Sequence, residues 1–179
     1  SDNSRRSPRQ WANEEDNALV TVFGPGHITE ETPGHSGALS ITDARILAFP
    51  VRSLTGVFAW VTSPAVLERL NRDLALANKV ALQHVPQPGK SQVAGTDRSP
   101  LLIDGRQMVL EEFDFTRTDD AQEVANWIAE HAVTDLATQN RLKTHLVVLH
   151  DDDFTHFVRH ATEVVARVGL DYERKTVKQ

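Results

Sequence analysis

The stretch from Gly37 to Ser63 constrains the fold more than any other part of this 179-residue chain. It contains two apolar runs, of which the second spans Val57 to Val61, with a short polar break that holds Gly56. Such a pattern predicts two adjacent antiparallel strands joined by a tight turn. Apolar residues occur at both alternating positions of the first run, so we expect these strands in a central sheet covered on both faces.

Polar residues interrupt this apolar stretch, among them Asp43, Arg45, Arg52, Ser53 and Thr55. A charge in a buried strand is costly unless it is paired, so Asp43 and Arg45 either pair with each other or face a ligand. Arg52 and Ser53 have two interpretations that the residues leave open. They are turn residues facing water, or they donate to phosphate oxygens, as guanidinium and hydroxyl groups do.

Composition narrows the class of protein. A hydrophobic content of 40% and a charged content of 25% are typical of a globular domain. No apolar run approaches the ~20 residues of a membrane span, and the arginine-rich start has no signal-peptide core. The absence of cysteine excludes disulfides and thiolate chemistry, so we expect a cytoplasmic protein without a membrane partner. The net charge of −6 argues against nucleic-acid binding over the whole surface but is compatible with a local groove.

The remaining pattern predicts helices interleaved with hairpins. A helix is expected over Trp11–Phe23 and another over Pro64–Ala77, capped by Ser63, with Leu67, Leu70 and Leu74 in its buried stripe. Residues 84–100 have the composition of a long loop.

The second half of the chain continues this pattern. Residues 101–103 and 107–115 should pair through a two-residue Asp104-Gly105 turn. A helix should follow Asp119 or Asp120, and Thr144–His150 should form a strand. A helix capped by residues 151–153 and a strand over Val164–Leu170 should complete an α+β domain of residues 1–179 with a mostly antiparallel sheet.

A cluster of histidines and carboxylates at 150–160 suggests a rival site. His156 and His160 share a helix face one turn apart, and Asp151, Asp152 and Asp153 precede them. This spacing suits a divalent metal or an acid–base pair of a hydrolase. It equally suits a helix that begins with carboxylates, which its N-terminal dipole favours.

Three segments carry a resemblance to a known family. They are GALSITDARILAFPVRSLTGVFAWVTSP at 37–64, QMVLEEFDF at 107–115, and LVVL at 146–149 followed by Asp152-Asp153-Phe154. In this order they resemble the backbone subunit of the type III-B CRISPR effector, the Cmr complex, of the RAMP superfamily. The resemblance implies a ferredoxin-like (RRM-type) RAMP domain, here partial. Within it, residues 84–115 would be a thumb-like hairpin insertion.

The resemblance also implies a function. A protomer of this family binds CRISPR RNA beside copies of itself and other Cmr subunits, and target RNA is cut at regular intervals. The resemblance places the expected RNA contacts at Arg52, Ser53, Arg45 and Asp43.

The family's cleavage aspartate lies on an N-terminal glycine-containing loop that has no counterpart here. We therefore expect no catalytic or metal-binding residue in these 179 residues, no cofactor held by them, and no RNA cleavage by them alone. Divalent metal such as Mg²⁺ is compatible with the complete enzyme. Two alternatives stay open: a non-catalytic RNA-binding scaffold, and a metal-dependent hydrolase that uses His156 and His160.

Overall fold

The computed structural model describes residues 18–25 and 34–161, which fall into two compact units, Ser1–Arg45 and Ile46–Gln179. In the first unit, a short segment around Ala38 and Leu39 lies against the end of helix α2 (Ala18–Phe23). The backbone N–H groups of Ala38 and Leu39 donate to carbonyls of this helix at 3.0 and 2.9 Å. The predicted helix Trp11–Phe23 is thus seen only over its last turns, because residues 11–17 lie outside the described part of the chain.

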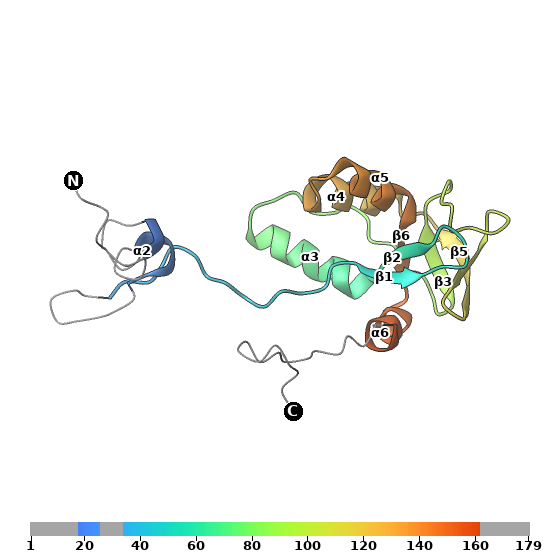
Figure 1. Cartoon of the computed structure of the whole chain (residues 1–179), viewed down its shortest axis with the longest axis horizontal. Helices are drawn as coiled ribbons and strands as arrows, with labels where there is room; N and C mark the ends of the chain where they lie inside the picture. Colours follow the sequence, from blue (N-terminus) through green and yellow to red (C-terminus); the bar gives the residue numbers. More distant parts are fainter. Residues whose placement is uncertain (1–17, 26–33, 162–179) are drawn as a thin grey trace, which may run out of the picture. The chain divides into compact units, whose positions relative to one another are not determined.

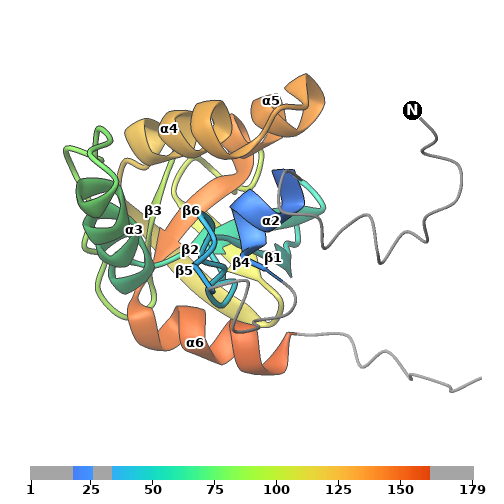
Figure 2. The same ribbon diagram turned by 90° about the vertical axis from the view of Figure 1, so that its left-hand side faces the viewer.

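The second unit is built on one six-stranded sheet in the order β1-β2-β6-β3-β5-β4. Figure 2 labels all six strands. The strands are β1 (Phe49–Arg52), β2 (Phe58–Thr62), β3 (Gln92–Gly95), β4 (Gln107–Leu110), β5 (Phe113–Asp119) and β6 (Leu146–Leu149). The helices are α3 (Pro64–Leu76), α4 (Gln122–Ala132), α5 (Leu136–His145) and α6 (Asp151–His160).

The predicted strand pair is confirmed for part of its length. β1 and β2 are antiparallel, with Phe49 opposite Val61 and Arg52 opposite Phe58. The prediction is wrong for residues 37–48, which form no strand, and Asp43 and Arg45 there are exposed. Residues 37–48 have no neighbouring strand to pair with in the described part of the chain, and strand formation is stabilised by packing against such a neighbour. The charges at Asp43 and Arg45 therefore need no buried partner.

The sheet is mixed, which corrects the expectation of a mostly antiparallel one. β6 runs parallel to β2 and antiparallel to β3, and β3 runs parallel to β5. Parallel neighbours need a crossover connection, and here helices α4 and α5 carry the chain from β5 back into the middle of the sheet at β6. Helix α5 was missed because its apolar pattern is weak, with Leu142 as its single buried residue.

The sheet is covered on both faces, as expected. Figures 1 and 2 place α4 and α5 on one side of the strands and α6 on the other. In β6, Leu146 and Val148 pack with α4, whereas Val147 and Leu149 pack with the α6 residues Phe154 and Phe157. All four β6 residues are fully buried. A short run with no polar face is typical of such a central strand.

The two edges of the sheet meet at one corner. Ser53, just after β1, forms an antiparallel bridge with Leu110 at the end of β4. The Ser53 hydroxyl donates to the Val109 carbonyl at 3.1 Å, and the Leu54 N–H donates to the same carbonyl at 3.1 Å. The sheet is therefore curled until its outermost strands are hydrogen-bonded to each other beside α6.

Residues 84–115, the predicted thumb, contribute strands β3 and β4 and the first residues of β5 to this sheet. The expected loop at 84–100 contains β3, a strand with three buried residues. The prolines and glycines that flank this strand gave the whole segment a loop-like composition. The turn at Asp104 and Gly105 has positive φ at both residues, but it is a three-residue loop because Ile103 pairs with Gln107. The expected strand 107–115 is two strands, β4 and β5, joined by a tight turn. The thumb assignment itself stays a prediction.

Helix α3 confirms the predicted helix, with a different buried stripe and a different cap. Leu67 is fully buried, whereas Leu70 and Leu74 are only half-buried. Ser63 occupies the cap position without a side-chain cap bond. The free N–H of Ala65 instead donates to the Asp151 carboxylate at 3.0 Å, across 86 residues of sequence.

Two further expectations concern the C-terminal part. The strand predicted at 144–150 is β6, and Thr144 and His145 belong to α5. The residue that caps α6 is His150, whose ring accepts the Asp152 N–H at 3.2 Å, so Asp151–Asp153 form the first turn and not the cap. The strand predicted at Val164–Leu170 lies outside the described residues. Within the described ranges, no helix is both long and apolar enough to cross a membrane.

Candidate functional site

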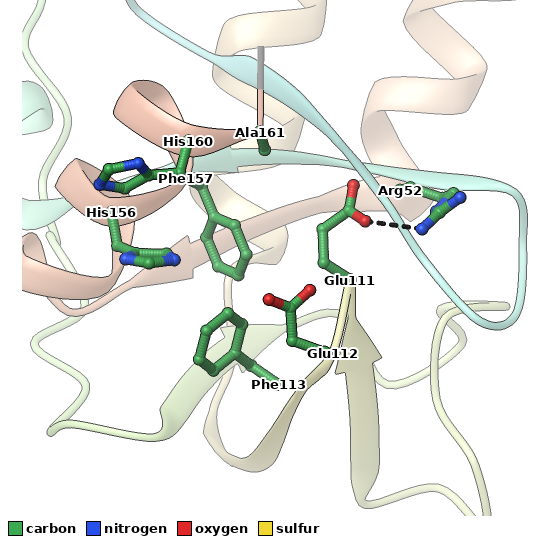
Figure 3. Close-up of a pocket in the computed structure, with 8 residues that line it drawn as sticks. All are labelled: Arg52, Glu111, Glu112, Phe113, His156, Phe157, His160 and Ala161. Atoms are coloured by element: carbon green, nitrogen blue, oxygen red, sulfur yellow. Dashed lines mark hydrogen bonds and ion pairs between the residues drawn. The ribbon is translucent and has the colours of Figure 1, made fainter. Parts of the chain in front are cut away.

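The principal pocket of the described chain opens where the sheet edges meet and holds a volume of about 590 Å³ (Figure 3). One wall is Arg52, the last residue of β1. A second is the turn between β4 and β5, which contributes Glu111, Glu112 and Phe113. The third is the last two turns of α6 and the residue after it, including His156 and His160. The pocket thus joins segments that are 59 residues apart, such as Arg52 and Glu111.

Arg52 and Glu111 hold the pocket entrance. A guanidinium N–H of Arg52 donates to a carboxylate oxygen of Glu111 at 2.9 Å, and the Arg52 side chain is 78% exposed. Exposed ion pairs contribute little to stability, about 0–1 kcal/mol, so the pair yields readily to another acceptor. A guanidinium carries five N–H donors. The remaining donors of Arg52 are open to an anionic group from solvent.

The backbone at Glu111 is strained and firmly held. Its φ of 52° is in the left-handed region, which non-glycine residues enter at a cost. The Glu111 N–H donates to the Arg52 carbonyl at 2.9 Å, and its carboxylate takes the Arg52 side chain. These two bonds keep the turn in a conformation that aims Glu111 and Glu112 at the pocket. Strained residues held by their surroundings are common at functional sites.

Four aromatic rings form the floor and one side. The Phe113 ring meets His156 edge-on at 5.0 Å between centroids and Phe157 at 5.7 Å. The rings of His156 and His160 are 4.7 Å apart. Phe157 is buried, whereas Phe113 is 38% exposed and both histidines are exposed. The rings of these four residues therefore give the pocket an aromatic lining on this side (Figure 3).

The aspartate run at 151–153 has a structural explanation. Asp151 accepts the Ala65 N–H, Asp152 pairs with Lys90 at 2.8 Å, and Asp153 accepts the Ser91 N–H at 3.1 Å. The hydrogen bond from Lys90 holds the pKa of Asp152 below its usual value. Each carboxylate thus ties the start of α6 to another element. Among residues 18–25 and 34–161, no three histidine or acidic side chains are grouped so as to hold a metal ion.

The four residues predicted to contact RNA have different surroundings. Arg52 lines the pocket and is exposed. Ser53 is only 7% exposed, and its hydroxyl is bonded to Val109. Asp43 and Arg45 are exposed in the other unit. Sequence reasoning missed Glu112 and Phe113 as pocket residues, since it read 107–115 as one continuous strand.

Comparison with known proteins gives one consistent result. The chain is 34% identical over 160 residues to the CRISPR system Cmr endoribonuclease Cmr4 of Pyrococcus furiosus, covering 88% of this chain and 52% of that protein. The crystal structure of oligomeric Cmr4 from the same organism matches with a TM-score of 0.67 at 31% identity, over 82% of this chain and 53% of the other. A second Cmr4 crystal structure matches with a TM-score of 0.65 at 32% identity, again over 82% and 53%. No protein-family model matches the chain. The chain spans about half the length of the relative and structures it matches.

Proposed function

We propose that this chain, which is homologous to Cmr4, is part of a backbone protomer of a type III-B Cmr complex and binds CRISPR RNA. The observation that carries the proposal is the similarity along 88% of the chain. In the complete protein, this protomer assembles with copies of itself and other Cmr subunits, and target RNA is cleaved. The chain's own contribution is the RNA contact, which we assign to Arg52.

Three features of Arg52 support this assignment. It ends an edge strand, its guanidinium is exposed, and the one partner of that guanidinium in the described structure is the carboxylate of Glu111, whose side chain is 22% exposed. A phosphate that replaces Glu111 would gain a bidentate guanidinium contact, which is stronger than a single-donor bond. Ser53 contributes indirectly, because its hydroxyl fixes the strand end from which Arg52 projects.

Filter binding of labelled CRISPR RNA across a salt series tests the assignment. Arg52→Ala should weaken binding several-fold and make the slope of log K against log salt shallower by about 0.7, the value for one lost phosphate contact on a single strand. Arg72→Ala is the matched control, because Arg72 is an exposed arginine on α3 and its loss changes the net charge equally.

A third variant separates the contact from the ion pair. Glu111→Gln keeps the Arg52 guanidinium and removes its competitor, so RNA binding should stay equal or become tighter. If Arg52→Ala and Arg72→Ala gave the same slope and affinity, Arg52 would be a surface residue and the assignment would be refuted. The aspartates near His156 give the hydrolase alternative no support, because each of them is already bonded to another segment.

A further inference from the structure

We infer that the pocket beside Arg52 receives a single nucleobase that carries an exocyclic amine, in preference to uracil. This inference rests on the proposed RNA binding and names what the same site would recognise. Its volume of about 590 Å³ lies in the range typical of sites for small ligands. Three features of the pocket favour such a base: the aromatic wall, the free carboxylate and the position of Arg52.

The aromatic wall suits a flat, uncharged ring. Phe113 and His156 both line the pocket, both are exposed, and their rings are in edge contact at 5.0 Å between centroids. Stacking of a base on an aromatic side chain is worth about 1–3 kcal/mol and needs no particular base. The wall therefore provides affinity, and selectivity must come from another group.

Glu112 is the group that selects. It lies between the strained residue Glu111 and Phe113, and among residues 18–25 and 34–161 no hydrogen bond or ion pair joins its side chain to another residue. Figure 3 shows its carboxylate beside the Phe113 ring. An ionised carboxylate only accepts hydrogen bonds. It accepts an amino N–H of adenine, cytosine or guanine, whereas the ring donor of uracil, N3–H, stands between two carbonyl oxygens that repel the carboxylate.

Arg52 fixes the direction of entry. The carboxylates of Glu111 and Glu112 repel a phosphate from the interior, whereas the exposed guanidinium of Arg52 attracts one to the rim. A nucleotide therefore enters with its base first and its phosphate at the edge. The pocket adds base preference to a contact that would otherwise read only the RNA backbone.

Cytidine and uridine provide the sharpest comparison, because they share one ring skeleton and differ only at C4, an amine or a carbonyl, and at N3, a bare nitrogen or an N–H. Both lack a phosphate, so their binding is independent of Arg52. In NMR titrations of the chain, cytidine should bind about 3- to 10-fold more tightly than uridine, as one charge-assisted hydrogen bond at an exposed carboxylate allows. The shifts should include signals of Phe113 and His156.

Three variants assign the roles. Glu112→Gln should bring the cytidine-to-uridine ratio close to one, because an amide can donate or accept. Phe113→Leu should weaken both nucleosides equally and leave the ratio unchanged, and Phe113→Tyr should restore binding. Asp73→Asn, an equal change of charge at an exposed position on α3, should alter neither value.

Two outcomes would overturn the inference. One is equal or undetectable binding of cytidine and uridine to the unaltered chain. The other is stronger perturbation of the same signals by arginine amide, which would mean that the pocket takes a cationic protein side chain. Failure here is distinguishable from failure of the proposed function. Loss of RNA affinity in Arg52→Ala without nucleoside selectivity removes only the inference, and selectivity with unchanged RNA affinity removes only the Arg52 assignment.

Discussion

Helix α3 provides a graded test of the packing, because three leucines along it differ in burial. Leu67 is fully buried against α4 and β6, Leu70 is half-buried, and Leu76 is 84% exposed. Truncation of Leu67 to alanine removes three carbons, worth about 2.4 kcal/mol at ~0.8 kcal/mol each. A residual cavity of roughly 40 Å³ adds about 1 kcal/mol at ~24 cal/mol per Å³. We therefore expect Leu67→Ala to lower the free energy of unfolding by about 3.4 kcal/mol.

The other two leucines calibrate this value. Leu70→Ala should cost about 1–2 kcal/mol, less than the 2–4 kcal/mol of a fully buried leucine, because part of its surface is already in water. Leu76→Ala should change the free energy of unfolding by less than about 0.5 kcal/mol. All three changes replace leucine with alanine in one helix, so differences in helix propensity cancel.

Urea unfolding followed by tryptophan fluorescence measures the series. Trp60 and Trp127 both pack against the cluster that contains Leu67, so their emission reports on this unit. With a slope of about 2 kcal/mol per M, Leu67→Ala should move the midpoint by about 1.7 M. A shift for Leu67→Ala no larger than that for Leu76→Ala would refute the packing of α3 described above.

Three further predictions concern single residues of the same unit. Burial lowers the pKa of His145 below its usual 6.5, so the folded state favours the neutral ring. The stability of the chain relative to His145→Gln should therefore be greatest above pH 6.5 and should decline as the pH falls through the lowered pKa. Thermal unfolding at several pH values measures this difference. Gly56→Ala should lower the free energy of unfolding more than Gly105→Ala does. Both glycines have positive φ, but only at Gly56 would the new carbon come within 2.9 Å of a buried leucine. Equal losses in urea unfolding would contradict this clash. Asp151→Ala should lower the free energy of unfolding by about 1 kcal/mol, because it removes the acceptor of the Ala65 N–H at the start of α3. Protection of the Ala65 amide from hydrogen exchange should fall. Unchanged protection would show that this hydrogen bond does not stabilise the helix start.

The local elements were predictable where sequence and burial agree. The strand pair 49–62 and helix α3 follow from apolar runs bounded by Gly56 and by Ser63-Pro64, which are local signals. The mixed sheet was not predictable, because the direction of a strand depends on how far its connection travels. Helix α5 has one buried residue, so its pattern carried little periodic signal.

The pocket was predictable only in part. Arg52 stood out as a charge at the end of an apolar run. Glu112 and Phe113 did not, because their role depends on the tight turn at Glu111, and positive φ at a glutamate has no signature in the sequence. The capping of α3 by Asp151 was equally hidden, since the two partners are 86 residues apart.

The meeting of the sheet edges bears on how this protein avoids unwanted association. An open edge strand exposes unpaired N–H and C=O groups, which can template strand addition by another chain. Here the outermost strands satisfy each other at the corner through Arg52, Ser53 and Leu54. Farther along β1, Pro50 has no N–H to offer an incoming strand. The chain is thereby protected along this border from pairing its sheet with a strand of another chain.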